Sequence, residues 1–342
     1  MKPVLAGIAG ALLLAACGTS REIPDGGPIP DSGPTTQPLA PIFYNVGFAS
    51  SGIVINDDGN FLAVSADAGV TLVLDADGLG TDDEATLPTT GVWQPLLTRT
   101  GPGGRSDLLN ADGTIFSLDL VDAGGLVYAQ LSPPPRSFAM RRDAEGVVAI
   151  VPDAGVQLLN STGALVQTFA LPAGTQADDI AADGAGRYYA ALNIDGGCAG
   201  IAVLADAGGG ELSHDFGGAP CAVTLSNDNT SLWLTAQVDG GATLYHVHAR
   251  QLPDPASLLG SWPLPGVFAT QVLVSGDDGV IAVLGQAPGN TLAMSREAAL
   301  VGGGPLPTVP ASEIQSAVGA VFDDSDALYI ADPLQQTIDV VR

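Results

Sequence analysis

The chain has 342 residues, of which 46% are hydrophobic and 14% are charged, so it can bury a large core and does not have a disordered composition. Its formal net charge is −26, and the basic cluster of Arg136, Arg141 and Arg142 is small. Because phosphate binding needs clustered lysines and arginines, this charge excludes nucleic acid and anionic lipid headgroups as partners.

The first residues have the pattern of an export signal. Lys2 gives a positive start, and Val4 to Ala16 form an apolar run of 13 residues. A helix that spans a membrane needs roughly 20 residues, so this run fits the hydrophobic part of a signal peptide better than a membrane-spanning helix.

The segment Leu14-Ala15-Ala16-Cys17 resembles the bacterial lipobox, a cleavage site directly before a cysteine. The resemblance implies that residues 1–16 are a signal peptide. It also implies that Cys17 becomes the mature N-terminus, with diacylglycerol on its sulfur and an acyl chain such as palmitate on its amine. Several acyl chains give stable membrane anchoring. The alternative is an ordinary signal peptide followed by an incidental cysteine.

Residues 17–41 are predicted to be a flexible tether. The stretch from Ser20 to Pro41 is rich in proline, glycine, aspartate and serine, and it has almost nothing to bury. Gly18 stands where an inner-membrane retention signal would have aspartate. We therefore expect a lipid-anchored protein on the outer membrane, facing the periplasm or the cell surface, if the cell has two membranes.

From residue 42 onward, short apolar runs alternate with turns, and the turns recur at a regular spacing. The steps between the turn markers are 44, 43, 40, 43, 50 and 46 residues, which is the spacing of β-propeller blades with four strands each. The markers are Gly59, Gly103, Gly146, Gly186, Asn229, Gly279 and Ser325. The sequence therefore predicts an all-β protein, a seven-bladed β-propeller over residues 42–342. The alternatives are another number of blades, an open array or two sandwiches.

The last repeat is incomplete, and this predicts how the ring closes. It supplies strands near Ser316–Phe322, Ala327–Ala331 and Thr337–Val341, and no fourth strand follows. A strand-like segment, Ile42–Phe48, precedes the first repeat. We expect this N-terminal strand to complete the last blade, because an unpaired blade would expose a sheet edge.

The terminal segment GAVFDDSDALYIADPLQQTIDVV, residues 319–341, resembles an NHL repeat. The chain as a whole is similar to the broad group of NHL, YVTN and gluconolactonase-like propellers. The match is good in one blade and loose in the others, and propellers host many unrelated functions.

Two cysteines remain after Cys17. Cys198 is predicted at the start of the third strand of the fourth blade, and Cys221 at the start of the first strand of the fifth. Such strand starts lie on the same rim of a propeller, and an exported protein meets oxidising conditions. We expect a Cys198–Cys221 disulfide, which could stabilise the fold by ~3 kcal/mol.

Histidine-based catalysis has few candidates, because the chain has only His214, His246 and His248. No G-x-S-x-G, H-E-x-x-H or P-loop motif occurs in the sequence. His246 and His248 alternate on one strand, so they point to the same side and could bind a metal. The favoured interpretation is two partly exposed strand residues.

Two groups of acidic residues could hold a metal. Asp75, Asp77 and Asp83 form a loop similar to a calcium loop, although an acidic hairpin loop is the simpler interpretation. Gluconolactonase-like propellers coordinate a divalent metal with side chains that converge on the central channel. Asp178, Asp179 and Asn227 are near inner strands here, but the sequence does not show that they converge.

We therefore assign no catalytic, cofactor-binding or metal-binding residue from the sequence. The function that it favours is a non-catalytic propeller lipoprotein at the bacterial cell envelope, which binds a protein or glycan partner. The alternatives are a metal-dependent, lactonase-like hydrolase and a structural component of an envelope assembly. Clustered carboxylates at the channel would favour the hydrolase, and exposed apolar residues on the rim would favour binding or assembly.

Overall fold

The structure is a computed structural model. The residues that it describes are 42–45, 50–55, 61–65, 71–74, 80–85, 95–100, 106–119, 124–141, 146–194, 197–205, 210–212, 216, 218–276, 279–286, 291–310, 314, 316–323 and 325–341. Contacts between Cα atoms divide the chain into Met1–Thr35 and Thr36–Arg342, and all described residues belong to the second unit. The predicted signal peptide and tether lie outside the described residues, and their boundaries stay predictions.

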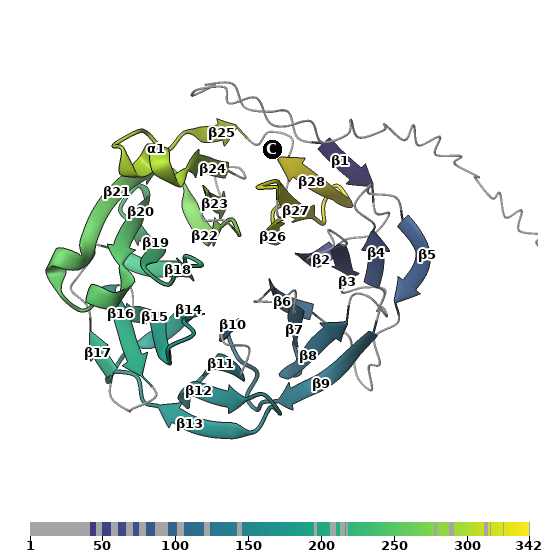
Figure 1. The fold of residues 1–342 in the computed structure, drawn as a ribbon, viewed down its shortest axis with the longest axis horizontal. Helices are drawn as coiled ribbons and strands as arrows, with labels where there is room; N and C mark the ends of the chain where they lie inside the picture. Colours follow the sequence, from purple (N-terminus) through teal and green to yellow (C-terminus); the bar gives the residue numbers. More distant parts are fainter. Residues whose placement is uncertain are drawn as a thin grey trace, which may run out of the picture. The chain divides into compact units, whose positions relative to one another are not determined.

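The described strands form seven antiparallel sheets of four strands each, and Figure 1 shows these sheets as the blades of a ring. The prediction of a seven-bladed propeller is confirmed. Blades one to four comprise β2 (Ser50–Ile55), β3 (Phe61–Ser65), β4 (Thr71–Leu74) and β5 (Gly80–Ala85); β6 (Pro95–Thr100), β7 (Ser106–Asn110), β8 (Thr114–Asp119) and β9 (Gly124–Gln130); β10 (Ser137–Met140), β11 (Gly146–Val151), β12 (Gly155–Asn160) and β13 (Leu165–Phe169); and β14 (Gln176–Ala182), β15 (Arg187–Ile194), β16 (Gly197–Ala205) and β17 (Gly210–Leu212).

The remaining blades follow the same order from the ring axis outward. They comprise β18 (Ala219–Leu225), β19 (Ser231–Val238), β20 (Gly241–His248) and β21 (Leu258–Pro265); β22 (Phe268–Val274), β23 (Val280–Gln286), β24 (Thr291–Arg296) and β25 (Thr308–Pro310); and β26 (Gly319–Phe322), β27 (Leu328–Asp332), β28 (Thr337–Val341) and β1 (Ile42–Asn45).

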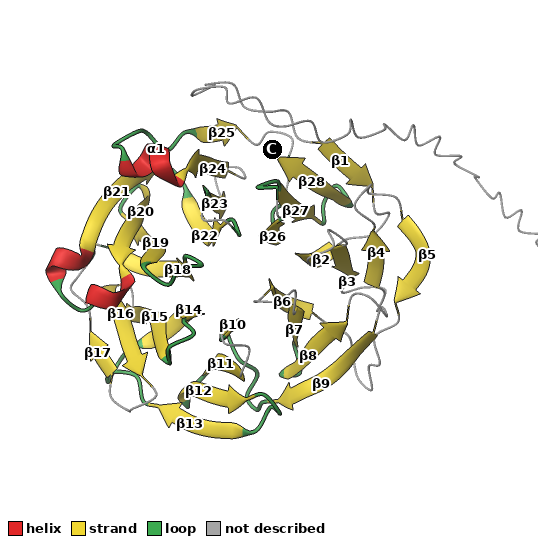
Figure 2. Ribbon diagram, viewed as in Figure 1, coloured by secondary structure: helices red, strands yellow, loops and turns green. Residues whose placement is uncertain are grey.

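Helices are few and short, as Figure 2 shows. The 3₁₀ helices η2 (Ala249–Gln251) and η3 (Pro255–Ser257) precede β21, and the helix α1 (Glu297–Val301) follows β24. Within the described part of the chain, no helix has the length and apolar character that crossing a membrane would require.

The ring closes as the sequence predicts. β1 pairs with β28 in antiparallel register, with Ile42 opposite Val340 and Asn45 opposite Thr337. The last blade therefore has the order β1-β28-β27-β26, in which the outer strand comes from the N-terminal side. This pairing covers the edge that β28 would otherwise expose. The innermost strand, β26, begins at Gly319, three residues later than predicted.

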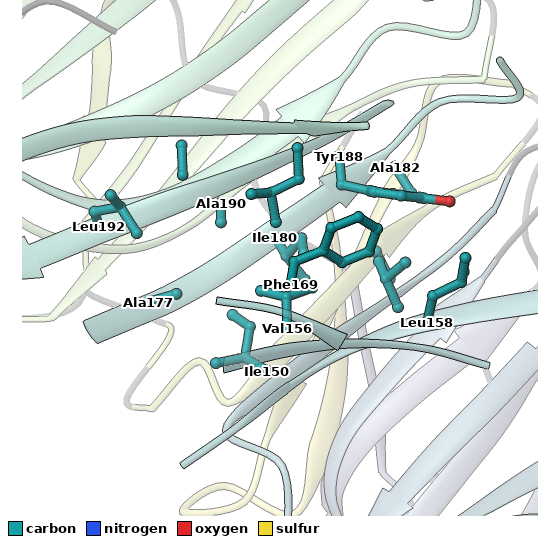
Figure 3. Close-up of a cluster of buried hydrophobic side chains, with 14 residues drawn as sticks. Ile150, Val156, Leu158, Phe169, Ala177, Ile180, Ala182, Tyr188, Ala190 and Leu192 are labelled. Atoms are coloured by element: carbon teal, nitrogen blue, oxygen red, sulfur yellow. The ribbon is translucent and has the colours of Figure 1, made fainter. Parts of the chain in front are cut away.

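The hydrophobic core lies between neighbouring blades. Figure 3 shows one such layer, in which Ile150 and Val156 of the third blade meet Ile180 and Tyr188 of the fourth. The Phe169 and Tyr188 rings pack 5.5 Å apart at an angle of 55°. Because each blade is covered on both faces, its second strand is apolar at nearly every position, and β11 (GVVAIV) is buried along its whole length.

Many of the aspartates of the repeat hold turns. Asp183 accepts hydrogen bonds from the backbone N–H groups of Ala185 and Arg187, at 2.8 Å each. In the last blade, Asp323 does the same for Ser325 and Ala327. An aspartate in this position satisfies the donors of a tight turn between the first and second strands. Part of the strong negative charge is therefore explained by turn structure.

Candidate functional site

The first strand of every blade lies nearest the ring axis (Figure 1). In five of these seven strands the pairing register shifts near the start of the strand, where a β-bulge inserts one residue. The shifts lie at Ser50/Gly52, Pro95/Leu97, Ala177/Asp179, Pro220/Ala222 and Ala269/Gln271. A bulge changes the direction of the local side chains. In β14 it places Asp178 and Asp179 side by side at the inner end of the fourth blade.

Asp179 is the centre of a polar cluster that joins four blades. Its Oδ1 accepts from Nη2 of Arg99 on β6, at 3.0 Å, and from Oγ of Ser137 on β10, at 2.7 Å. Its Oδ2 accepts from the backbone N–H of Val223 on β18, at 3.0 Å. Nε of Arg99 also donates to the carbonyl oxygen of Phe138, at 3.3 Å. We call these five residues the Asp179 cluster.

The contacts of the Asp179 cluster use both carboxylate oxygens of Asp179. The Arg99 and Asp179 side chains are only 23% and 14% exposed, so each is shielded from water and needs its partner. A cation that used Asp179 as a ligand would have to replace the Arg99 guanidinium and the Ser137 hydroxyl. The arrangement is suited to holding the second to fifth blades together.

Asp178 lies at the outer side of the cluster and has weaker partners. Nδ2 of Asn193 donates to Asp178 Oδ2 at 3.2 Å, and Nη1 of Arg136 lies 3.8 Å from Asp178 Oδ1. Burial raises the pKa of Asp178, and the neighbouring Asp179 raises it further, while Asn193 and Arg136 act in the opposite direction. This carboxylate is the more accessible of the two.

The predicted metal ligands do not come together. Asn227 lies in the turn after β18, beyond the end of that strand, and its side chain donates to the carbonyl oxygen of Gly276. Asp178 and Asp179 lie near the start of β14. Asp75 and Asp77 lie outside the described residues, and Asp83 is described only by its place in β5.

His246 is part of the core between blades rather than a surface residue. The prediction that it is partly exposed is wrong, because its side chain is buried. Its ring stacks on Trp233, with centroids 4.1 Å apart and planes 3° apart, and its Nε2 is hydrogen-bonded to Oγ of Ser231 at 2.8 Å. The opposite strand of the sheet thus supplies two partners that the sequence did not reveal.

The environment of His246 keeps its ring neutral. Burial is the largest cause that lowers the pKa of His246, to about 4; the nearby His248 lowers it further, and Asp228 raises it slightly. His248 is half-buried on the same strand. Across the residues that the structure describes, no group of three or more histidine, cysteine, aspartate or glutamate side chains could hold a metal ion.

The two remaining cysteines are on the predicted strands. Cys198 lies in β16, the third strand of the fourth blade, opposite Asn193. Cys221 is the residue that the bulge inserts into β18, the first strand of the fifth blade, and β16 and β18 contact each other. The side chains of both cysteines lie outside what the structure describes, so the disulfide stays a prediction. His214 and Cys17 also lie outside the described residues.

Large apolar side chains are exposed at several places on the ring. They are Leu126, Val127, Leu165, Val166, Leu258, Leu259, Phe268, Val301, Val318 and Leu334. The first four occur as adjacent pairs on β9 and β13, the outer strands of the second and third blades. The sequence analysis did not single them out, although the lack of charge in these two strands could have indicated them.

Comparisons with known proteins support the fold and do not extend to a family. No protein-family profile and no curated protein matches the sequence. The structure is similar to hydrazine synthase from Kuenenia stuttgartiensis, with a TM-score of 0.67 and 10% identity over 92% of this chain and 99% of that one. It is also similar to a streptogramin B lyase, with a TM-score of 0.66 and 15% identity over 88% and 97% of the two chains. At such identities the likeness shows the propeller fold alone.

Proposed function

We propose that the protein is a binding module, anchored to the bacterial cell envelope through lipid on Cys17, which holds a partner on its propeller without catalysing a reaction. The observation that carries this proposal is the engagement of Asp179. Its two oxygens accept from Arg99, Ser137 and the backbone of Val223, so the best-placed carboxylate near the ring axis already has a structural role.

The lactonase-like alternative is less well supported by the same geometry. Asp178 and Asp179 are adjacent, as a metal site would need, but arginines approach both carboxylates. Arg99 lies 3.0 Å from Asp179 and Arg136 lies 3.8 Å from Asp178. A bound divalent cation would be repelled by two guanidinium groups within about 4–6 Å of it. Exposed apolar side chains on the outer strands favour a partner instead.

The lipid anchor can be tested through the amines of the mature protein. Lys2 is the only lysine, so cleavage before Cys17 followed by acylation of its amine would leave no primary amine in the chain. We expect an amine-reactive dye to leave the membrane-extracted protein unlabelled. The Cys17→Ala variant, which cannot be processed, should keep Lys2 and become labelled. Equal labelling of both proteins would contradict the anchor.

The choice between binding and hydrolysis can be tested on one sample. The full chain is purified from envelope extracts without chelators, and its metal content and co-purifying molecules are measured together. We expect less than one divalent cation per ten chains and a specifically retained partner, about as in a binding module that uses no metal. A stoichiometric metal that is lost in the Asp178→Asn variant would instead support the hydrolase.

A further inference from the structure

The outer strand of each blade pairs on one side only, so its other edge presents free backbone donors and acceptors. Proteins usually guard such edges with charge, proline or short strands. Most outer strands here follow this rule. β5 carries Asp82, Asp83 and Glu84, and β21 carries Pro263 and Pro265. β17 and β25 have three residues each, and β1 has four.

The outer strands of the second and third blades do not follow it. β9 (GGLVYAQ) has seven residues and β13 (LVQTF) has five, and neither has a charged residue or a proline. Each strand also presents a pair of exposed apolar side chains. Their exposed fractions are 78% for Leu126, 60% for Val127, 56% for Leu165 and 58% for Val166. An apolar edge of this length is suited to pairing with another strand.

The two strands are held beside each other. The hydroxyl of Tyr128, next to Val127 in β9, donates to the carbonyl oxygen of Asn160 at the end of β12. The Asn160 side chain accepts from the backbone of Thr162 and Ala164 and fixes the turn that leads into β13. Gly163 in this turn has φ +77°, and a Cβ there would meet the carbonyl oxygen of Tyr128. Figure 1 shows β9 and β13 following each other along the periphery.

The charge of the molecule restricts what can occupy these edges. Residues 124–135 and 154–177, which contain both strands, have no charged side chain, while the whole chain carries −26. Two copies that paired here would bring strongly negative bodies within about 10 Å, where salt screens their repulsion incompletely. A glycan could use the backbone groups, but it would leave the apolar pairs uncovered.

We propose that the outer edges of β9 and β13, which we call the bare edges, bind an extended segment of a partner protein by strand addition. The segment has apolar side chains at alternate positions, which cover Leu126, Val127, Leu165 and Val166, and basic residues flank it, which the negative charge of this chain attracts. The inference rests on the proposed binding function and specifies its partner as a protein strand.

A synthetic peptide provides the probe. It has about eight residues, alternates threonine and valine, and carries two lysines at each end. We expect it to bind the full chain, measured by fluorescence anisotropy. The same peptide with alternate backbone nitrogens methylated should lose binding by about tenfold or more, because strand addition depends on the backbone donors. Equal binding of the two peptides would overturn strand addition.

A pair of matched variants locates the site. The change Val127→Lys with Leu165→Lys guards the bare edges, and Val301→Lys with Leu334→Lys adds the same two charges at exposed apolar positions of the sixth and seventh blades. We expect the first variant to bind the peptide about tenfold more weakly or less, and the second to stay within about twofold of the unchanged protein.

Two results would contradict the bare edges as the site: no difference between the variants, or self-association of the full chain that only the first variant abolishes. These results are separate from the test of the proposed function. A partner retained from the envelope with equal strength by both lysine variants would preserve the binding module and remove only the bare edges.

Discussion

Replacing Asp179 with alanine should lower the free energy of unfolding by about 3 kcal/mol. The change leaves the Arg99 guanidinium, the Ser137 hydroxyl and the Val223 N–H without the acceptor that they share. These groups come from three different blades, so the loss is expected to loosen the ring between the second and the fifth blade. Chemical denaturation followed by tryptophan fluorescence measures the effect.

A double-mutant cycle separates the ion pair from the rest of the cluster. Arg99→Met with Asp179→Leu replaces the two charges by apolar side chains of similar size, and it should cost less than Asp179→Ala alone, because neither charge stays behind unpaired. A coupling energy below about 0.5 kcal/mol would contradict the importance of this pair.

Acid should destabilise the protein through His246. The pKa of this histidine is lowered from 6.5 to about 4, so the unfolded chain takes up its proton at a higher pH than the folded chain. The stability that neutral His246 allows is fully present above pH 6.5, is lost as the pH falls toward 4 and stays lost below that. The total loss is about 3 kcal/mol.

The carboxylates also titrate in this range, so the contribution of His246 must be read as a difference between variants. His246→Phe keeps a ring against Trp233 and removes the titrating group. The difference in unfolding free energy between this variant and the unchanged protein should vary with pH between 6.5 and 4. His248→Phe, on the same strand, should retain most of the acid loss. A pH-independent difference for His246→Phe would show that the ring is not buried in neutral form.

The fold could be predicted because its signals are local and repeated. Each blade has a turn marker such as Gly186 or Ser325, and each second strand is apolar throughout, as in β11. Closure could be predicted because the last repeat is one strand short and Ile42–Asn45 is available. The exact strand limits were harder, since Val318 donates to Ala331 beyond the end of β26.

The candidate site could be predicted only in part, because it depends on contacts between blades. The sequence indicated Asp178 and Asp179, yet it could not show that Arg99, 80 residues away, would reach Asp179. His246 was placed on the correct strand, but its burial depends on Trp233 opposite and on the sixth blade beyond. The bare edges were within reach, because a strand without charge or proline can be recognised once its position as the outer strand is known.

The most direct test of the whole account is the pairing of β1 with β28, since the closed ring holds both the Asp179 cluster and the bare edges in place. Asn45 lies opposite Thr337, so the Asn45→Cys and Thr337→Cys pair, in a chain with Cys17→Ser, should form a disulfide on mild oxidation. Trypsin cuts after Arg21, Arg99 and Arg296, and the cross-linked product joins residues 22–99 to residues 297–342.

The control places the second cysteine at Thr168, on β13 of the third blade. Closure predicts the cross-linked peptide from the Asn45–Thr337 pair and none from the Asn45–Thr168 pair. Equal cross-linking of both pairs, or no cross-link from the first, would mean that the N-terminal strand does not complete the last blade.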